Sequence, residues 1–267
     1  MLNKEKSMLQ QKDMNKLHKA YRTLENPGFR IKAMNVVGKP IEKGIELLPD
    51  CVEKKIAKAC NIALEKAASV ALFTLPEERK KPSNWFHRVS VWATGALGGF
   101  GGLPGTLVEL PVSTIIMLRS VFDIAHSKGE DIYDIDTKLA ALQVFALGGE
   151  STGDDLADTA YYSVRTGMAL EVQTAYRFLT KGSGKLMDKN APALIQLIQK
   201  IATRFSIPVT EKAVAQAMPF VSAGIGALLN DIFIAHFQEM AQAHFTVRQL
   251  ERKYGKEVVR QAYQSLN

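Results

Sequence analysis

The stretch from Gly95 to Ala125 constrains the fold of this chain most strongly, because it joins a glycine-rich run to a nearly uncharged apolar segment. It opens with six glycines in eleven residues, and its only charged residues are Glu109, Arg119 and Asp123. Glycine is favoured where a chain turns tightly or where another backbone approaches closely. The glycines form overlapping G-x-x-x-G pairs, a spacing typical of closely packed helices. We therefore expect a glycine-rich hairpin at the centre of the fold.

Two registers are open for the helix that follows this run, and both end near Ser127. Pro104 predicts a loop, after which Thr106 and Glu109 fit a capping box at the start of a new helix. In that register Pro111 removes an internal hydrogen bond and kinks a buried helix. In the other register the helix begins near Pro111, which leaves Glu109 as a carboxylate in apolar surroundings.

The segment 93–118 contains one charge and is long enough to raise the question of a membrane span, which needs about 20 apolar residues. Two prolines, several glycine peptides and Glu109 argue against a simple span, because unsatisfied backbone groups are costly in lipid. A buried hairpin is our expectation, and a segment that partly inserts is the alternative. A buried Glu109 would need a partner such as Arg119 or Arg165.

Apolar residues at helical spacing predict an all-α, multi-helix bundle for the rest of the chain. The expected helices cover 4–25, 29–37, 41–48, 50–74, a segment from 83, 136–147, a segment from Asp154 or Asp155 through 178, 191–205, 210–217, 219–254 and a last short helix. Asp50 and Asp136 are expected to open helices, and Gly129 to close one. We divide the chain into a basic N-terminal helical arm, 1–38, and a helical domain, 39–267. Gly224, Gly226 and Asn230 interrupt a second apolar segment, which is expected to pack against the first.

Charge is distributed unevenly along the chain. Residues 1–92 hold 18 Lys/Arg against 10 Asp/Glu, residues 93–170 hold 4 against 10, and residues 171–267 hold 12 against 7. The basic ends suit an anionic membrane surface. Nucleic acid is not expected as a partner, because the lysines lack interleaved aromatic residues and no recognition motif is present. The start has no apolar run typical of a secretory signal, and Cys51 and Cys60 are too far apart on one helix to pair, so we expect a cytoplasmic protein.

The residues do not point to a catalytic centre or a cofactor. There is no G-x-S-x-G motif and no phosphate-binding G-x-x-x-x-G-K-[ST] loop. Asp123-x-x-His126 and His236-x-x-Glu239 each place a carboxylate and an imidazole one helical turn apart, the spacing seen in metal sites of helical bundles. His126, His236 and Glu239 are therefore weak metal candidates. They leave a metal-dependent enzyme as the alternative function.

The run GGFGGLPGTLVELPVSTIIMLRSVFDIAHSKGED, together with LAALQVFALGG and PFVSAGIGALLNDIF, resembles the EcsC family of bacterial proteins. The resemblance implies a membrane-associated protein, since the founding member of the family is encoded beside the subunits of an ABC exporter. Together with the basic N-terminal helix and the glycine-rich run, it leads us to expect a protein that associates peripherally with the inner face of the cytoplasmic membrane and binds lipid or a membrane partner of the ABC-transporter type. It implies no catalytic residues. The segment expected to bind such a partner is Gly98, Gly99, Phe100, Gly101, Gly102, Leu103 and Pro104. The buried polar candidates are Glu109, Arg119, Asp123 and Asn230.

Overall fold

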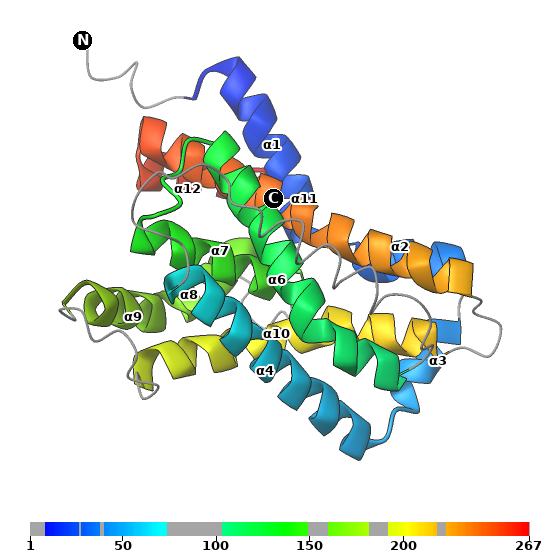
Figure 1. Ribbon diagram of the computed structural model, residues 1–267. Helices are drawn as coiled ribbons and strands as arrows, with labels where there is room; N and C mark the ends of the chain where they lie inside the picture. The colour runs from blue at the N-terminus through cyan, green and yellow to red at the C-terminus, as the bar shows by residue number, and fades with distance from the viewer. Residues whose placement is uncertain are drawn as a thin grey trace, which may run out of the picture.

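The computed structural model describes residues 9–26, 28–37, 40–73, 103–148, 160–181, 192–217 and 223–266, which form helices and no strand (Figure 1). The helices are α1 (Gln11–Glu25), α2 (Phe29–Val37), α3 (Pro40–Glu46), α4 (Asp50–Phe73), α6 (Leu103–Ser127), α7 (Ile135–Leu147), α8 (Ala160–Gly167), α9 (Ala169–Lys181), α10 (Pro192–Gln216), α11 (Ala223–Tyr254) and α12 (Lys256–Gln264). The all-α multi-helix fold predicted from the sequence is confirmed. The run Gly98–Gly102 and the expected hairpin lie outside the described residues.

The bundle is built around α7, in which every residue from Thr137 to Leu147 is buried. A helix that is apolar on all sides belongs in a protein interior. Phe145 of α7 meets Phe205 of α10 with ring centroids 5.1 Å apart, and Phe205 meets Phe237 of α11 at 5.4 Å. These edge-on ring contacts tie the three helices into one core.

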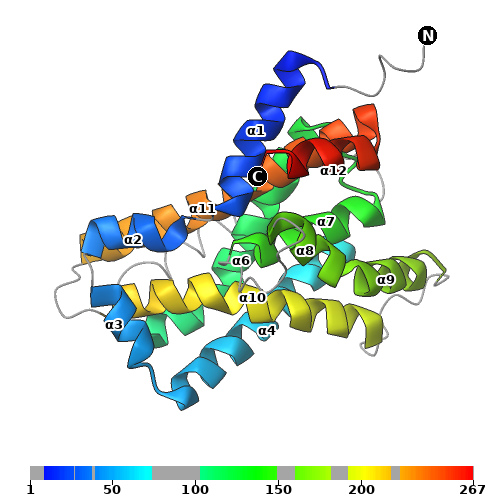
Figure 2. The ribbon, with the colours of Figure 1, turned by 180° about the vertical axis from the view of Figure 1, so that it is seen from behind.

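The other helices pack around this core and against one another. Helix α4 packs on α6 and α10, and α6 packs on α11. Helix α1 lies along α11 and also contacts α12, while α9 packs on α10. Seen from the front and from behind, α1 and α4 occupy opposite sides of the molecule (Figures 1 and 2). The division of the chain at residue 38 stays a prediction.

Helix α6 begins earlier than either register predicted from the sequence. It starts at Leu103, so Pro104 lies in its first turn, where the missing N–H of proline has no helical partner to lose. The helix then continues through Pro111, and both the capping box at Thr106 and the start near Pro111 are wrong. Leu110 is fully buried, and packing of α6 against α4 and α11 holds the helix together across the proline. The kink expected at Pro111 stays a prediction.

Two further predictions about where helices end are also wrong. Helix α10 runs through Pro208, because Phe205 and Val209 on either side are fully buried. The predicted break between 205 and 210 is therefore wrong. Conversely, the single helix predicted through 178 is divided after Gly167, since glycine weakens a helix and the next residue, Met168, is buried.

The helix ends follow local capping rules, and some capping residues differ from those predicted from the sequence. Gly129 has a φ of 81° and closes α6, as predicted. The amide of Glu130 donates to Ala125 O and that of Gly129 to His126 O, which is the Schellman arrangement. Asp134, and not Asp136, caps α7 by accepting from the Asp136 amide. Similarly, α4 begins at Asp50 itself, so this residue lies inside the helix and does not precede it.

Candidate functional site

Two of the polar residues singled out in the sequence meet deep in the bundle. Glu109 of α6 accepts a hydrogen bond from Lys212 Nζ of α10 at 2.5 Å, and Asn230 Oδ1 of α11 accepts one from the same ammonium at 2.6 Å. Lys212 is fully buried, and its Nζ lies 4.9 Å from the centre of the Phe233 ring. The side chain of Glu109 keeps 15% of its surface exposed. This buried triad joins three helices through one lysine.

Lys212 is the residue that sequence reasoning missed. Burial lowers the pKa of Lys212, and the neighbouring charge of Glu109 raises it in opposition. Arg165, one of the partners predicted for Glu109, pairs instead with Glu251, and the ion pair of Glu109 is with Lys212. A signal for Lys212 was present: seven residues separate it from buried Phe205, so it lies on the core face once α10 is continuous through the proline.

The other predicted buried polar residue on α6 does not lie in the interior. Asp123 is exposed, so its expected burial is wrong. Arg119, one turn earlier, is half-buried. Burial lowers the pKa of Arg119 while the charge of Asp123 raises it, so the two side chains lie near enough for their charges to interact. Neither residue joins the Lys212 triad.

The three weak metal candidates have separate surroundings. His236 is fully buried and its Nε2 lies 2.9 Å from Gly148 O, which can only accept, so Nε2 carries the proton. Glu239 is exposed and pairs with Lys32 at 2.5 Å, while His126 lies exposed on α6. No group of three or more His, Cys, Asp or Glu side chains suited to a metal occurs among the described residues.

Close packing at Gly148 fixes the position of His236. A Cβ at residue 148 would lie 2.8 Å from His236 Nε2 and 2.7 Å from the Phe237 ring, so only glycine fits there without a shift. Burial lowers the pKa of His236 to about 4.

In contrast, Gly226 of the second apolar segment has nothing within 4 Å of the position of a Cβ. The second apolar segment does pack against the first, as expected, since α11 lies on α6, but Gly226 is not a point of close packing.

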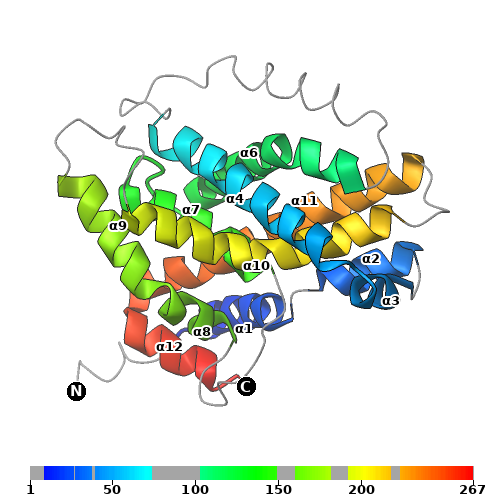
Figure 3. The ribbon, with the colours of Figure 1, turned by 90° about the horizontal axis from the view of Figure 1, so that it is seen from below.

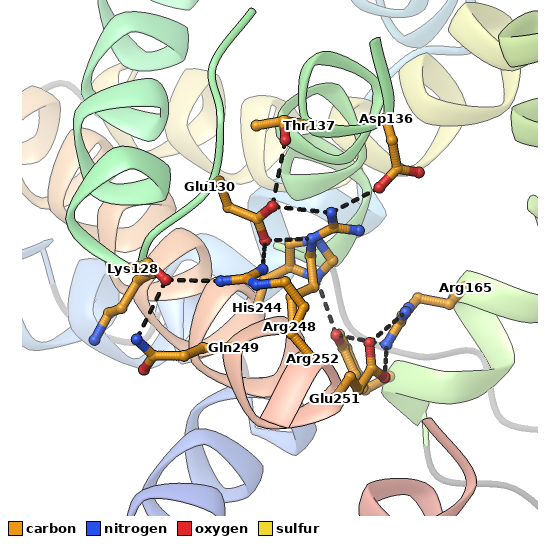
Figure 4. A network of polar contacts seen from close by, with 11 residues as sticks. Lys128, Glu130, Asp136, Thr137, Arg165, His244, Arg248, Gln249, Glu251 and Arg252 are labelled. Atoms are coloured by element: carbon orange, nitrogen blue, oxygen red, sulfur yellow. Dashed lines mark hydrogen bonds and ion pairs between the residues drawn. The ribbon is translucent and has the colours of Figure 1, made fainter. Parts of the chain in front are cut away.

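A second polar network lies at the C-terminal end of α11 (Figure 4). Glu130 accepts from Arg248 Nε at 2.8 Å and also from Arg252. Arg248 additionally reaches Asp136 at 2.8 Å, and the Arg252 Nη2 donates to the carbonyl of Lys128 at 2.7 Å. Although burial favours the protonated acid, the two arginines hold the pKa of Glu130 below its usual value.

The same end of α11 anchors α8. Arg165 makes a two-pronged contact with Glu251, at 2.7 and 3.1 Å, and donates to the Tyr161 hydroxyl at 3.1 Å. The same hydroxyl forms a hydrogen bond with His244 Nδ1, 3.0 Å away. His244 is fully buried, and burial together with the charges of Arg165 and Arg248 places its pKa well below the usual value.

The solvent face of α1 is basic. Its exposed side chains include Lys12, Lys16, His18, Lys19 and Arg22. The two acidic residues of α1 are turned away from this face, as follows from their partners. Asp13 is buried and accepts from Lys16, Lys253 and Tyr254. The carboxylate of Glu25 accepts from the amides that open α8 and from the Tyr263 hydroxyl. Helix α1 thus presents positive charge outward with no exposed carboxylate of its own.

Comparison with known proteins identifies a family. The EcsC protein family matches residues 2–250, a range that includes α1, the Lys212 triad and Arg248, while Glu251 and Arg252 of the network at the end of α11 follow it. No curated protein and no solved structure matches the chain. In the described part of the chain, no helix combines the length and hydropathy needed to cross a membrane.

Proposed function

The chain belongs to the EcsC protein family, and from that premise we propose that it is a non-enzymatic helical protein that associates peripherally with the inner face of the cytoplasmic membrane. On this proposal it binds anionic lipid or a membrane partner of the ABC-transporter type. The glycine-rich segment Gly98–Pro104 would provide close packing or shallow insertion at the contact.

The observation that carries the proposal is the charge of the α1 solvent face. Four exposed cations, Lys12, Lys16, Lys19 and Arg22, lie on this helix. Its two carboxylates make contacts within the protein, and Asp13 also pairs with one of the four, Lys16. A basic residue next to an anionic leaflet contributes about 1 kcal/mol of attraction. The apolar stripe of α1 is already buried against the protein, as Leu17 and Leu24 show. Attraction through α1 is therefore electrostatic.

Vesicle flotation tests the proposal directly. The full chain should float with vesicles that contain phosphatidylglycerol and stay in the lower fractions with pure phosphatidylcholine. Raising the salt from about 0.1 M to about 1 M shortens the Debye length from about 10 Å to about 3 Å and should release the protein. Failure to float with the anionic vesicles at low salt would contradict the proposal.

A further inference from the structure

Cationic side chains from two distant segments converge where α1 and the end of α6 meet the last turns of α11. The Lys128 carbonyl, just after α6, accepts from Gln249 Nε2 at 3.2 Å and from Arg252 Nη2 at 2.7 Å. The next residue of α11, Lys253, donates from its Nζ to Asp13 of α1 at 2.6 Å. The end of α11 therefore holds Lys128 and the first turns of α1 in fixed positions beside each other.

The lysines of α1 are arranged on one side of the helix. Lys12, Lys16 and Lys19 are spaced by four and three residues, which places them on one helical face. Asp13 compensates Lys16 at 2.7 Å, and it is also the partner of Lys253. Lys19 and Lys128 form no ion pair with any residue in the described ranges. The cluster thus carries positive charge in excess of its carboxylates.

Lys128 feels the charges of α1 although more than a hundred residues separate them in the chain. Its pKa is lowered by burial and then by the charges of Lys16 and Lys19. Like charges held together in this way favour a bound anion, which relieves their mutual repulsion. The Schellman turn at Gly129 fixes the backbone from which Lys128 extends.

We propose that Lys16, Lys19 and Lys128 together hold the phosphate of an anionic phospholipid headgroup, so that the membrane surface lies along the solvent face of α1. This inference rests on the proposed function and names the surface that performs it. The cluster binds by charge and does not insert, because the apolar residues of α1 are occupied by α11 and α12.

A lipid surface fits this face better than a nucleic acid. Proteins that bind single strands add aromatic rings on which bases stack. The aromatic residue of α1, Tyr21, packs against Tyr263 with ring centroids 5.0 Å apart, and so it is engaged within the protein. The exposed side chains of α1 are cationic or neutral polar groups, which suit headgroup phosphates.

The test compares two pairs of lysine substitutions in the full chain. K19Q/K128Q removes two charges from the cluster, and K58Q/K66Q removes two exposed charges from α4, on the opposite side of the molecule (Figures 1 and 2). Binding to phosphatidylglycerol vesicles is measured for both pairs at low salt. We expect the affinity to fall about 30-fold for K19Q/K128Q, about fivefold for each lysine, and to change less than twofold for K58Q/K66Q.

The outcomes separate this inference from the proposed function. If the wild-type chain floats and K19Q/K128Q floats equally well, the membrane docks elsewhere and the inference is overturned while the proposed function stands. If the wild-type chain does not float, both fail. Tighter binding of the wild-type chain to duplex DNA than to vesicles, lost in K19Q/K128Q, would overturn the lipid as occupant. Unchanged melting temperatures of the variants exclude unfolding as the cause of lost binding.

Discussion

Two clusters along α11 each compensate the charge of buried or partly buried cations, but with different numbers of partners. Near the start of the helix, fully buried Lys212 has one carboxylate partner, Glu109, and one neutral acceptor, Asn230. Near its end, Arg248 and Arg252 share Glu130, and their side chains keep 16% and 41% of their surface exposed. Helix α11, which packs on α6, α7 and α10 (Figure 3), contributes residues to both clusters.

The clusters differ in whether each cation has a second charged or carbonyl acceptor besides its first carboxylate. Arg248 has a second carboxylate in Asp136, and Arg252 has the Lys128 carbonyl as well as Glu130. Loss of one partner at this end therefore leaves each arginine with another acceptor or with water. Lys212 has no exposed surface, so loss of Glu109 leaves a charge in the interior with only a neutral amide. The buried triad should depend on a single carboxylate, whereas the network at the helix end should tolerate substitution.

The largest effect is expected for E109Q. Breaking a buried ion pair leaves an uncompensated charge, and we expect a loss of about 3 kcal/mol in the free energy of unfolding, measured by urea denaturation at neutral pH. E130Q, made at the other cluster, should cost about 1.5 kcal/mol, because its arginines keep other acceptors. Equal losses for the two variants would contradict the difference between the clusters.

The double variant E109Q/K212M provides the control for E109Q. Replacing Lys212 by an apolar side chain of similar length removes the charge that E109Q leaves uncompensated. The double variant should therefore recover more than half of the stability that E109Q loses. A double variant that is less stable than E109Q would show that Lys212 contributes through its packing and hydrogen bond to Asn230 more than through its charge.

The buried triad also shows how far the sequence could lead. Glu109 and Asn230 could be singled out because each is a polar residue in a long apolar segment, and the structure brings them together. Lys212 cannot be paired with them if Pro208 ends a helix, since only the continuous α10 places this lysine in the core. The predicted Asp123 burial failed for a related reason: a largely apolar segment does not reveal which side of its helix faces solvent, and here that side carries Asp123.

A smaller effect is expected from His236, which lies between the two clusters on α11. Burial lowers the pKa of His236 to about 4, so the folded chain keeps this imidazole neutral where the unfolded chain, with a pKa of about 6.5, binds a proton. Stability is therefore fully present above pH 6.5 and is lost as the pH falls toward 4. Between pH 7 and pH 5 the contribution of His236 should fall by about 2 kcal/mol.

His236→Gln is the comparison variant for this pH dependence. Its amide nitrogen can still donate to Gly148 O, but the side chain does not titrate. Unfolding free energies of both proteins, measured from pH 7 to pH 5, should show a flatter profile for the variant. Both proteins keep a further decline from His244, whose pKa is also lowered, so only the difference between the two profiles reports His236. Parallel profiles would show that His236 does not titrate in this way.

The smallest effect is expected for R252Q, and it tests the tolerance of the network at the helix end. Arg252 is 41% exposed, and Glu130 keeps its contact with Arg248 when Arg252 is removed. Partly exposed ion pairs contribute little, because water compensates the separated charges, so R252Q should lower the free energy of unfolding by no more than about 0.5 kcal/mol in urea denaturation at neutral pH. A loss as large as that of E109Q would mean that the contacts of Arg252 with Glu130 and the Lys128 carbonyl stabilise the fold as much as the buried Glu109–Lys212 pair does. The exposure of the cation to solvent would then not decide which cluster tolerates substitution.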